Sequence, residues 1–532
     1  MTSVVPFPWT PRQPRVSWNI ISVTISLGLG LNIVLTPLKA YLCESFPWQI
    51  SSTGFPPAFP TWRDTENYLV EQYRRQYNTS MFARGGFYHH DVLNSTYVHR
   101  VALSRLNAST PCYEILAHLH GGISYPRETQ ATMCSFMSTV NVSTNTSCFE
   151  TRIFTVTIGT ACIWITNGDD ITILATNTSD NLTYYIAYKL RTTVVFMTVK
   201  LLYRLALTSY LAVHMWTRYY RHYITLARQC VKLPNTQRCV IVLGDPTSMF
   251  LLHPFVSLCL ALDVWLSIGA VSVEMLAVLQ VRDRWQFFLA CVYLSRTVWF
   301  CYLALACTSA VLKWGHWAHR FTPLDPTLVA IAAAFIAGPL TYIQGRSNLI
   351  AMYLWVFNVV ATDTHSTEGV FAVLLYTITI GLFPVQFGFV HYKWLRRQQR
   401  MATEFASFAY NDWKHRATLS LEAYLFGFGH AQCRRGGSMY SVFAQNPELK
   451  RSPCISQRGA DCFVICYGAR NVAHECIRLT LLSVFDGDQK AVKVVAHESG
   501  AVFGALELAS SATGTIRCIL HKPVNCDAVW IE

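Results

Sequence analysis

The sequence predicts a polytopic α-helical membrane protein with six spans, an α+β domain between the first two spans and a β-rich domain after the last. Three observations carry this prediction. Charged residues make up only 14% of the 532 residues, well below the rough quarter typical of soluble domains, and mean hydropathy is +0.27. Basic residues gather in short segments beside long apolar runs. Every N-x-S/T sequon falls in one segment that has no spanning run.

The first predicted span covers 17–41. The residues before it, 1–16, are polar and Pro-rich and carry Arg12 and Arg15, whereas 17–41 is uncharged until Lys39. A bilayer crossing takes about 20 apolar residues, so this run is long enough. A signal peptide is the alternative, but the run exceeds the usual core of ~7–15 residues and no small-x-small cleavage site follows it. We therefore expect a signal-anchor with 1–16 in the cytosol.

The segment 42–191 is predicted to be lumenal or extracellular and glycosylated. A single sequon is common by chance, but seven in this segment and none elsewhere indicate an accessible surface in the secretory pathway. The seven acceptor residues are Asn78, Asn94, Asn107, Asn141, Asn145, Asn177 and Asn181.

The same segment is predicted to fold as an α+β domain. "TWRDTENYLVEQYRRQY" has helical spacing with Asp64 as a plausible N-cap, and "ACIWITNGDDITIL" predicts a hairpin across Asn167-Gly168. In an oxidising compartment four cysteines can form two disulfides, with three pairings open, and Cys43 is the odd cysteine left over. The four candidates are Cys112, Cys134, Cys148 and Cys162.

The segment 192–391 is predicted to hold five further spans. If the preceding domain is outside, the basic loop 217–238 and the basic segment "KWLRRQQR" fall inside, as the positive-inside rule requires. Both basic segments fall inside when the fourteen-residue run 348–361 is re-entrant or interfacial, which gives six spans. If this run crosses, there are seven spans and the tail is outside. The five predicted spans are 192–216, 250–276, 286–312, 326–344 and 369–391.

The final segment, 392–532, is predicted to be a cytosolic helix followed by a small β domain. Short alternating runs such as "DCFVICY" and "TIRCILH" lie between Gly, Asp and Ser positions. Zinc binding is an alternative for its cysteines, but they lack paired C-x-x-C spacing, which favours buried structural thiols. These cysteines are Cys433, Cys454, Cys462, Cys466 and Cys476.

Five Asp, Glu, Lys and Arg residues lie inside the predicted spans after the first, where each needs a partner or a function. Helical spacing and depth place them in one interior charge ladder of three cations and two anions. The ladder has two interpretations: ion pairs that lock the helix bundle, or a polar path for an ion, proton or small anion. Its members are Lys200, Arg204, Asp263, Glu274 and Arg296.

No cofactor, metal or catalytic site is predicted. The sequence lacks a P-loop, a Rossmann fingerprint, an H-E-x-x-H motif and a kinase signature. The "YHHD" and "HLHGG" motifs resemble a metal site and an esterase oxyanion turn, but no G-x-S-x-G follows, so structural histidines are favoured. The histidine motifs contain His89, His90, Asp91, His118 and His120.

The net charge of +13 does not indicate nucleic-acid binding, because the basic residues lie in the loops that flank the spans. No stretch matches a nucleic-acid-binding module. The lipid bilayer is the expected partner, with protein partners for the outer domain and the tail.

Two stretches, "VLGDPTSMFLLHPFVSLCLALDVWLSIG" and "RGGSMYSVFAQNPELKRSPCISQRGADCFVICY", resemble a family of uncharacterised polytopic membrane proteins of oomycetes such as Phytophthora. The resemblance covers roughly 190–532. It implies a eukaryotic plasma-membrane or endomembrane protein and brings no activity with it.

Together these features favour a multi-pass surface or endomembrane glycoprotein that is not an enzyme. We expect sensing, adhesion or scaffolding that couples the outer domain to the cytosolic one. The alternative is a transporter or channel that uses the charge ladder.

Overall fold

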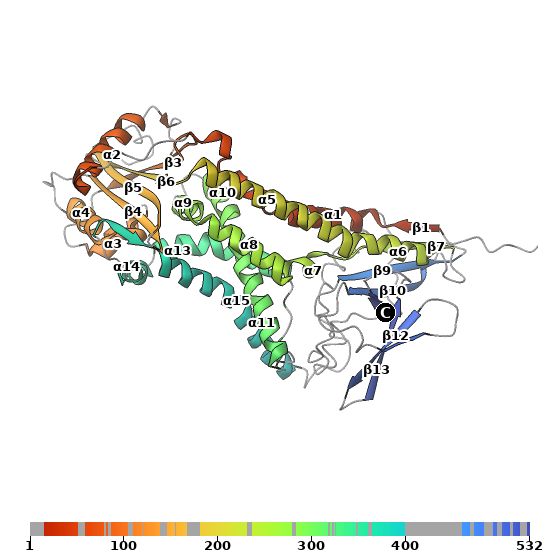
Figure 1. The fold of residues 1–532 in the computed structure, drawn as a ribbon. Helices are drawn as coiled ribbons and strands as arrows, with labels where there is room; N and C mark the ends of the chain where they lie inside the picture. Colours follow the sequence, from red (N-terminus) through yellow and green to blue (C-terminus); the bar gives the residue numbers. More distant parts are fainter. Residues whose placement is uncertain are drawn as a thin grey trace, which may run out of the picture.

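The structure is a computed structural model. It describes residues 15–51, 59–78, 81–82, 87–104, 110–119, 121–138, 146–154, 156–167, 181–230, 237–278, 284–315, 317, 320–321, 324, 326–346, 349–359, 364–398, 460–468, 473–482, 493–496, 503–510, 514–521 and 529–531. Figure 1 shows a six-stranded sheet at one end of the molecule, an eight-stranded sheet at the other, and a helical region between them.

The helical region contains apolar helices of membrane-crossing length. In the described ranges four helices qualify by length and composition, and the number rises to six if each of two bent pairs forms one span. The four are Val194–Arg228, Arg284–Trp314, Pro326–Ile343 and Val370–His391; the bent pairs are Ile20–Val34 with Leu38–Gln49, at 77°, and Pro254–Leu266 with Ile268–Val278, at 71°.

Short breaks divide most of these helices. A 3-10 turn, for example, separates α10 from α11. In chain order the elements are α1 (Ile20–Val34), η1 (Leu38–Leu42), η2 (Pro47–Gln49), α5 (Val194–Met215), η6 (Trp216–Tyr220), α6 (Arg221–Cys230), α7 (Thr247–Leu251), α8 (Pro254–Leu266), α9 (Ile268–Val278), α10 (Arg284–Leu294), η7 (Ser295–Thr297), α11 (Val298–Trp314), α12 (Pro326–Phe335), η9 (Ile336–Leu340), α13 (Thr341–Arg346), α14 (Leu349–Val359) and α15 (Val370–Gln398).

The first predicted span differs most from the structure. A strand, β1 (Arg15–Trp18), precedes α1, and the helix ends at Val34 rather than continuing to residue 41. After Pro37 the chain bends and continues as η1. Apolar composition alone does not locate such a bend, because hydropathy is averaged over a window longer than the break.

The six-stranded sheet has the order β2-β3-β6-β5-β4-β8. All its pairings are antiparallel except β4 with β8, which is parallel. Helix α2 (Trp62–Gln76) packs on one face, and α3 (Cys112–His118), α4 (Arg127–Ser138) and α9 pack on the other. The strands are β2 (Tyr88–Asp91), β3 (Thr96–Ser104), β4 (Thr146–Ile153), β5 (Val156–Asn167), β6 (Asn181–Leu190) and β8 (Ser366–Glu368).

Three sequence predictions can be compared with this domain. Helix α2 is capped by Thr61, whose Oγ1 accepts a hydrogen bond from the Asp64 backbone N–H at 3.3 Å, so the prediction of Asp64 as the N-cap was wrong by one turn. The first arm of the predicted hairpin lies within β5, and the second arm lies outside the described residues. Disulfides join the four candidate cysteines as Cys112–Cys134 and Cys148–Cys162.

The run 348–361 forms α14, which packs against α3 and the η4 turn (Gly122–Ser124) beside the six-stranded sheet. Strand β8 follows it and enters that sheet next to β4. The chain then returns through α15. These contacts hold α13, α14 and the start of α15 at the end of the helical region nearest this sheet (Figure 1).

The eight-stranded sheet has the order β1-β7-β9-β10-β14-β13-β12-β11. Six of its strands come from the predicted tail domain, but β1 and β7 come from before and within the helical region. Strand β1 pairs with β7 in parallel, and β7 pairs with β9 in antiparallel. The other strands are β7 (Arg238–Val242), β9 (Ala460–Tyr467), β10 (Ala473–Leu482), β11 (Lys493–Ala496), β12 (Phe503–Ser510), β13 (Gly514–His521) and β14 (Val529–Ile531).

A network of tyrosines, which we call the tyrosine contact, joins α1 to the π-helical segment η6 near this second sheet. Tyr220 donates from its hydroxyl to the Ser26 carbonyl at 2.9 Å, and Tyr219 donates to the Gly244 carbonyl at 2.6 Å. Tyr223 donates to the Tyr219 hydroxyl at 3.1 Å. Gly30 permits this close approach, because a Cβ there would lie 2.5 Å from the Tyr220 hydroxyl.

Several predicted features lie outside the described residues. They are the helix beyond Gln398, the sequon residues Asn107, Asn141, Asn145 and Asn177, and His120, Cys433 and Cys454.

Candidate functional site

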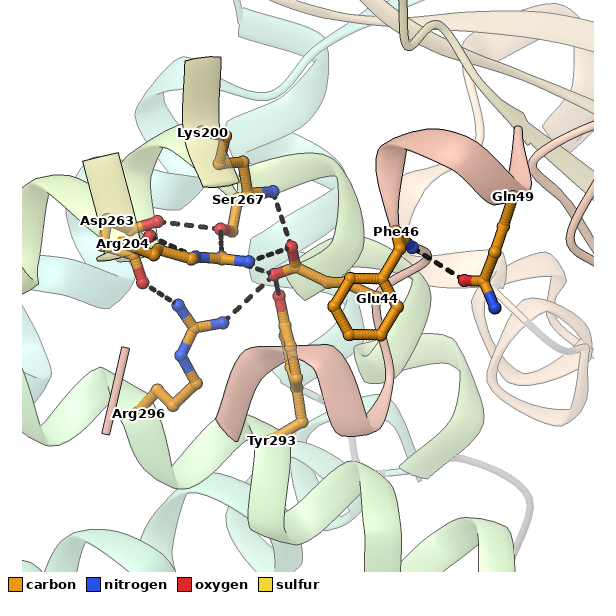
Figure 2. A network of polar contacts seen from close by, with 9 residues as sticks. All are labelled: Glu44, Phe46, Gln49, Lys200, Arg204, Asp263, Ser267, Tyr293 and Arg296. Atoms are coloured by element: carbon orange, nitrogen blue, oxygen red, sulfur yellow. Dashed lines mark hydrogen bonds and ion pairs between the residues drawn. The ribbon is translucent and has the colours of Figure 1, made fainter. Parts of the chain in front are cut away.

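A buried cluster of charged and polar side chains lies in the helical region, at the end nearest the six-stranded sheet (Figure 2). We call it the charge cluster. It draws on four separate parts of the chain: the turn after η1, helix α5, the α8–α9 break, and the α10–η7 junction. Its members are Glu44, Lys200, Arg204, Asp263, Ser267, Tyr293 and Arg296.

Arg204 is the centre of the cluster, and its side chain is completely buried. Its Nη1 and Nη2 donate to the two carboxylate oxygens of Glu44 at 2.8 and 2.9 Å. Its Nε donates to Asp263 Oδ1 at 2.7 Å, and Nη2 also reaches Ser267 Oγ at 2.8 Å. A planar guanidinium suits this geometry because its donors point outward in fixed directions.

Glu44 is the main acceptor. Besides Arg204 it accepts from Lys200 Nζ at 2.7 Å and from Arg296 Nη1 at 3.2 Å, and the Tyr293 hydroxyl donates to it as well. Arg296 also pairs with Asp263. Each carboxylate therefore contacts at least two cations, which offsets the cost of removing these charges from water.

Helix breaks bring the acidic groups and Arg296 to one place. Glu44 follows the 3-10 turn η1, Ser267 is the residue between α8 and α9, and Arg296 lies in the 3-10 turn η7. Gly269, just after the α8–α9 break, allows α9 to approach β6, since a Cβ there would lie 2.9 Å from the Leu190 side chain. Glu44, Ser267 and Arg296 thus lie at breaks between helical segments, whereas Lys200 and Arg204 lie within α5 and Asp263 lies within α8.

The cluster contains three cations and two carboxylates, which leaves one positive charge. Both carboxylates are bonded to cations from two or more elements. This arrangement suits a crosslink among helices. Removing one partner from a buried pair typically costs about 3–5 kcal/mol, because the other charge stays buried without compensation.

Four of the five predicted ladder residues meet in this cluster, as one compact group rather than as a ladder. The fifth, Glu274, is buried on α9 and faces the Cys43 thiol. None of the ion pairs in the described part of the chain includes it.

Sequence reasoning missed Glu44. It lies three residues beyond the predicted first span and was assigned to the outer domain. The bend after α1 brings it back among the helices. One signal was available: three cations against two anions left a positive charge unmatched, and Glu44 is the first acidic residue after the first apolar run.

Two of the remaining candidate groups lie on strands of the two sheets where the structure describes them. His89, His90 and Asp91 lie on β2, and the tail cysteines Cys462, Cys466 and Cys476 are buried on β9 and β10. Within the described residues, no group of three or more His, Cys, Asp or Glu side chains is arranged to hold a metal ion.

No family model, no curated protein and no solved structure matches this chain.

Proposed function

We propose that the chain is a multi-pass membrane glycoprotein that couples a lumenal or extracellular α+β domain to a cytosolic β-rich domain, in sensing, adhesion or scaffolding. One observation carries the proposal. Helix α1 with η1 and η2, and the continuous helix α5–η6–α6, both run between the two sheets, and two contacts join them: Tyr220 to Ser26 near the eight-stranded sheet and Arg204 to Glu44 near the six-stranded sheet. A displacement of one sheet is thereby transmitted to the other.

The connections at the sheets are short. Strand β6 ends at Leu190 and α5 begins at Val194, while α6 ends at Cys230 and β7 begins at Arg238. Strand β1 leads into α1 with one residue between them. Short linkers transmit motion better than long ones, because a flexible segment absorbs a displacement through its own dihedral angles.

Strand pairing supports six spans. Strands β1, β7 and β9 share one sheet, which is compatible only with topologies that keep these three parts of the chain on one side of a membrane. Strands β4 and β8 share the other sheet, which keeps the segments before α5 and before α15 on one side as well. Both pairings agree with a run 348–361 that does not cross.

The sequon positions agree with an outer α+β domain. Asn78 is exposed after α2. Asn94 lies in the β2–β3 turn, where its Nδ2 donates to Asp91 at 2.7 Å. Both belong to the domain of the six-stranded sheet, and the eight-stranded sheet contains no sequon.

Topology is the first test. A C-terminal tag is protease-sensitive in sealed microsomes if the tail is cytosolic, and glycosidase shifts the band if the α+β domain is lumenal. A protected tag on a glycosylated chain would contradict the six-span arrangement and the coupling with it.

Coupling is the second test. Fab fragments raised against the glycosylated α+β domain are added to the full chain in nanodiscs, and amide hydrogen exchange is measured at β7 and β9. We expect some Fabs to change exchange there in the wild type. Tyr220→Phe, which removes the hydrogen bond to Ser26, should weaken the response.

The matched control is Tyr210→Phe, which removes a half-exposed hydroxyl from the same helix. It should respond as the wild type does. Exchange at β7 and β9 that no Fab changes would refute coupling.

A further inference from the structure

A cavity of about 140 Å³ lies between the six-stranded sheet and the helical region. One face of the sheet forms its roof, through residues such as Phe149 and Ile186. Its walls come from α9 and α15, through Val271, Met275 and Val373. Thr297 and Val264 also line it. Each directly follows a charge-cluster residue in the sequence, Arg296 and Asp263, so the cavity adjoins the cluster.

The size and lining of the cavity select an apolar occupant. An engineered apolar cavity of about 150 Å³ in another protein stays dry and binds benzene, so this cavity has room for about six carbon atoms. The lining is mainly aliphatic and aromatic but includes hydroxyls such as those of Thr377 and Tyr188, so a matching occupant has an apolar body and one oxygen acceptor. A short section of hydrocarbon chain that carries an ester or carboxyl oxygen matches both properties.

Two polar atoms at the cavity lack a partner. The hydroxyls of Thr377 and Tyr188, which both line the cavity, are buried without a hydrogen bond in the described structure. Thr341, which also lines the cavity, bonds instead to the Ala337 carbonyl at 2.6 Å. A buried hydroxyl without a partner is unfavourable, so an acceptor atom from a ligand would stabilise this site.

The outer face of α15, next to the cavity, exposes apolar residues that contact lipid. On α15 the cavity-lining residues alternate with exposed apolar residues, including Phe371, Leu375 and Ile378. A helix that exposes side chains of this kind at membrane depth contacts lipid tails. Hydrocarbon chains carrying an ester or carboxyl oxygen therefore surround the wall of the cavity.

We infer that the cavity binds an acyl chain of a membrane lipid, whose ester or carboxyl oxygen accepts a hydrogen bond from Thr377. The chain fills the space between the sheet and α9. The α+β domain packs onto the helices across this cavity. Its packing therefore depends on the lipid composition of the membrane. It does not depend on the coupling proposed above, because it requires only the sheet–helix junction.

The test uses photoactivatable lipids with a diazirine within the first six carbons of the chain, because the cavity has room for about six carbons next to the oxygen that Thr377 binds. The full chain is reconstituted in liposomes that contain either a diazirine phosphatidylcholine or a diazirine free fatty acid, and the crosslinked peptides are mapped by mass spectrometry. We expect label on α9 and on the sheet face, at residues such as Met275 and Phe149. Label from both probes assigns the chain to bilayer lipid; label from the fatty acid alone assigns it to a free fatty acid.

Two variants with matched controls make the result decisive. Val373→Phe fills the cavity and should remove most of this label, whereas Leu375→Phe, on the exposed side of α15, should keep it. Thr377→Val keeps the side-chain shape and should weaken labelling about five-fold through loss of one hydrogen bond. The exposed Thr379→Val should leave labelling unchanged.

Label confined to the exposed face of α15, or equal label in Val373→Phe and wild type, would overturn the inference. If Val373→Phe does not fold, as judged by size-exclusion chromatography, Thr377→Val decides alone. Equal labelling of Thr377→Val and Thr379→Val would then overturn it.

Discussion

The charge cluster and the tyrosine contact join the same two parts of the chain, α1 with its extension and α5 with its extension, by opposite chemistry. The cluster is ionic, lies near the six-stranded sheet, and has Arg204 bonded to both of its carboxylates. The tyrosine contact is neutral, lies near the eight-stranded sheet, and consists of single hydroxyl hydrogen bonds such as that from Tyr220 to Ser26.

The difference concerns what happens when one member is lost. A neutral hydrogen bond contributes about 1 kcal/mol, and its loss leaves the neighbouring bonds in place. A member lost from the cluster leaves an unpaired charge in a buried site, which costs several times more. Loss of any one member should therefore destabilise the whole charge cluster. Loss of one tyrosine hydroxyl should weaken the tyrosine contact only in part.

Arg204→Met should have the largest effect. It removes the only side chain that bonds Glu44, Asp263 and Ser267 together. We expect the free energy of unfolding to fall by about 3–5 kcal/mol. Thermal unfolding followed by size-exclusion chromatography measures it.

The matched control is Arg221→Met, which removes an exposed arginine from α6, the continuation of the same helix. Its unfolding temperature should equal that of the wild type. Equal unfolding temperatures for the two variants would show that the cluster does not stabilise the fold.

Glu44→Gln should rank second and should exceed Asp263→Asn. Glu44 contacts three cations and Tyr293, whereas Asp263 contacts two cations. Both variants remove one negative charge, but without Glu44 the Lys200 ammonium loses its carboxylate partner, whereas without Asp263 all three cations keep Glu44. We expect losses of about 3 and 2 kcal/mol for the two variants, measured by thermal unfolding.

Asp263→Asn also separates a structural cluster from a transport path. A structural cluster predicts reduced folding and retention inside the cell. A transport path predicts a folded protein at the surface that has lost ion flux in proteoliposomes. The second result would favour a transporter or channel over the coupling function.

Tyr223→Phe should cost less, about 1 kcal/mol. It removes the donor to Tyr219 and the acceptor of the Gly244 backbone N–H, at 3.1 Å in each case. Tyr210→Phe serves as the control. A loss as large as that of Arg204→Met would contradict the contrast between the two contacts.

Acidification should act on neither contact and have the smallest effect. Burial lowers the pKa of His90, on β2, from 6.5 to about 4. Its folded-state pKa lies below the unfolded value, so the unfolded chain takes up the proton first as pH falls. Stability is therefore full above pH 6.5 and declines towards pH 4, by about 1 kcal/mol between pH 7 and 5.5.

Amide exchange of β2 and β3 at these two pH values reports the local loss. His90→Phe keeps a ring to stack on Tyr97, whose centroid lies 4.1 Å from that of His90, and should flatten the pH dependence. A slope unchanged in this variant would assign the dependence to other groups.

The sequence predicts the apolar helices and the convergence of charges but not their interruptions. Hydropathy averages over many residues, so breaks as short as Ser267 or the turn at Ser295–Thr297 do not register in it. Glu44 was missed for the same reason, because only the bend after α1 brings it to Arg204.

The sequence also did not predict which strands belong to the same sheet. Strands β9, β10 and β13 show alternating patterns that predict a β domain, but β1 pairs with β7 across more than two hundred residues. Parallel, non-local pairs leave no turn signal between them, and the three-residue β8 is too short to show a pattern. These pairings follow from the arrangement of the helices, which sequence periodicity does not contain.

The pairing of β1 with β7 and of β7 with β9 has a consequence for biogenesis. The ribosome makes β1 first, β7 midway and β9 only after the last apolar helix, so the sheet completes only after every intervening segment has been made. Until β9 is made, the edge of β7 that it pairs with is unoccupied, and an unpaired strand edge is open to non-native pairing.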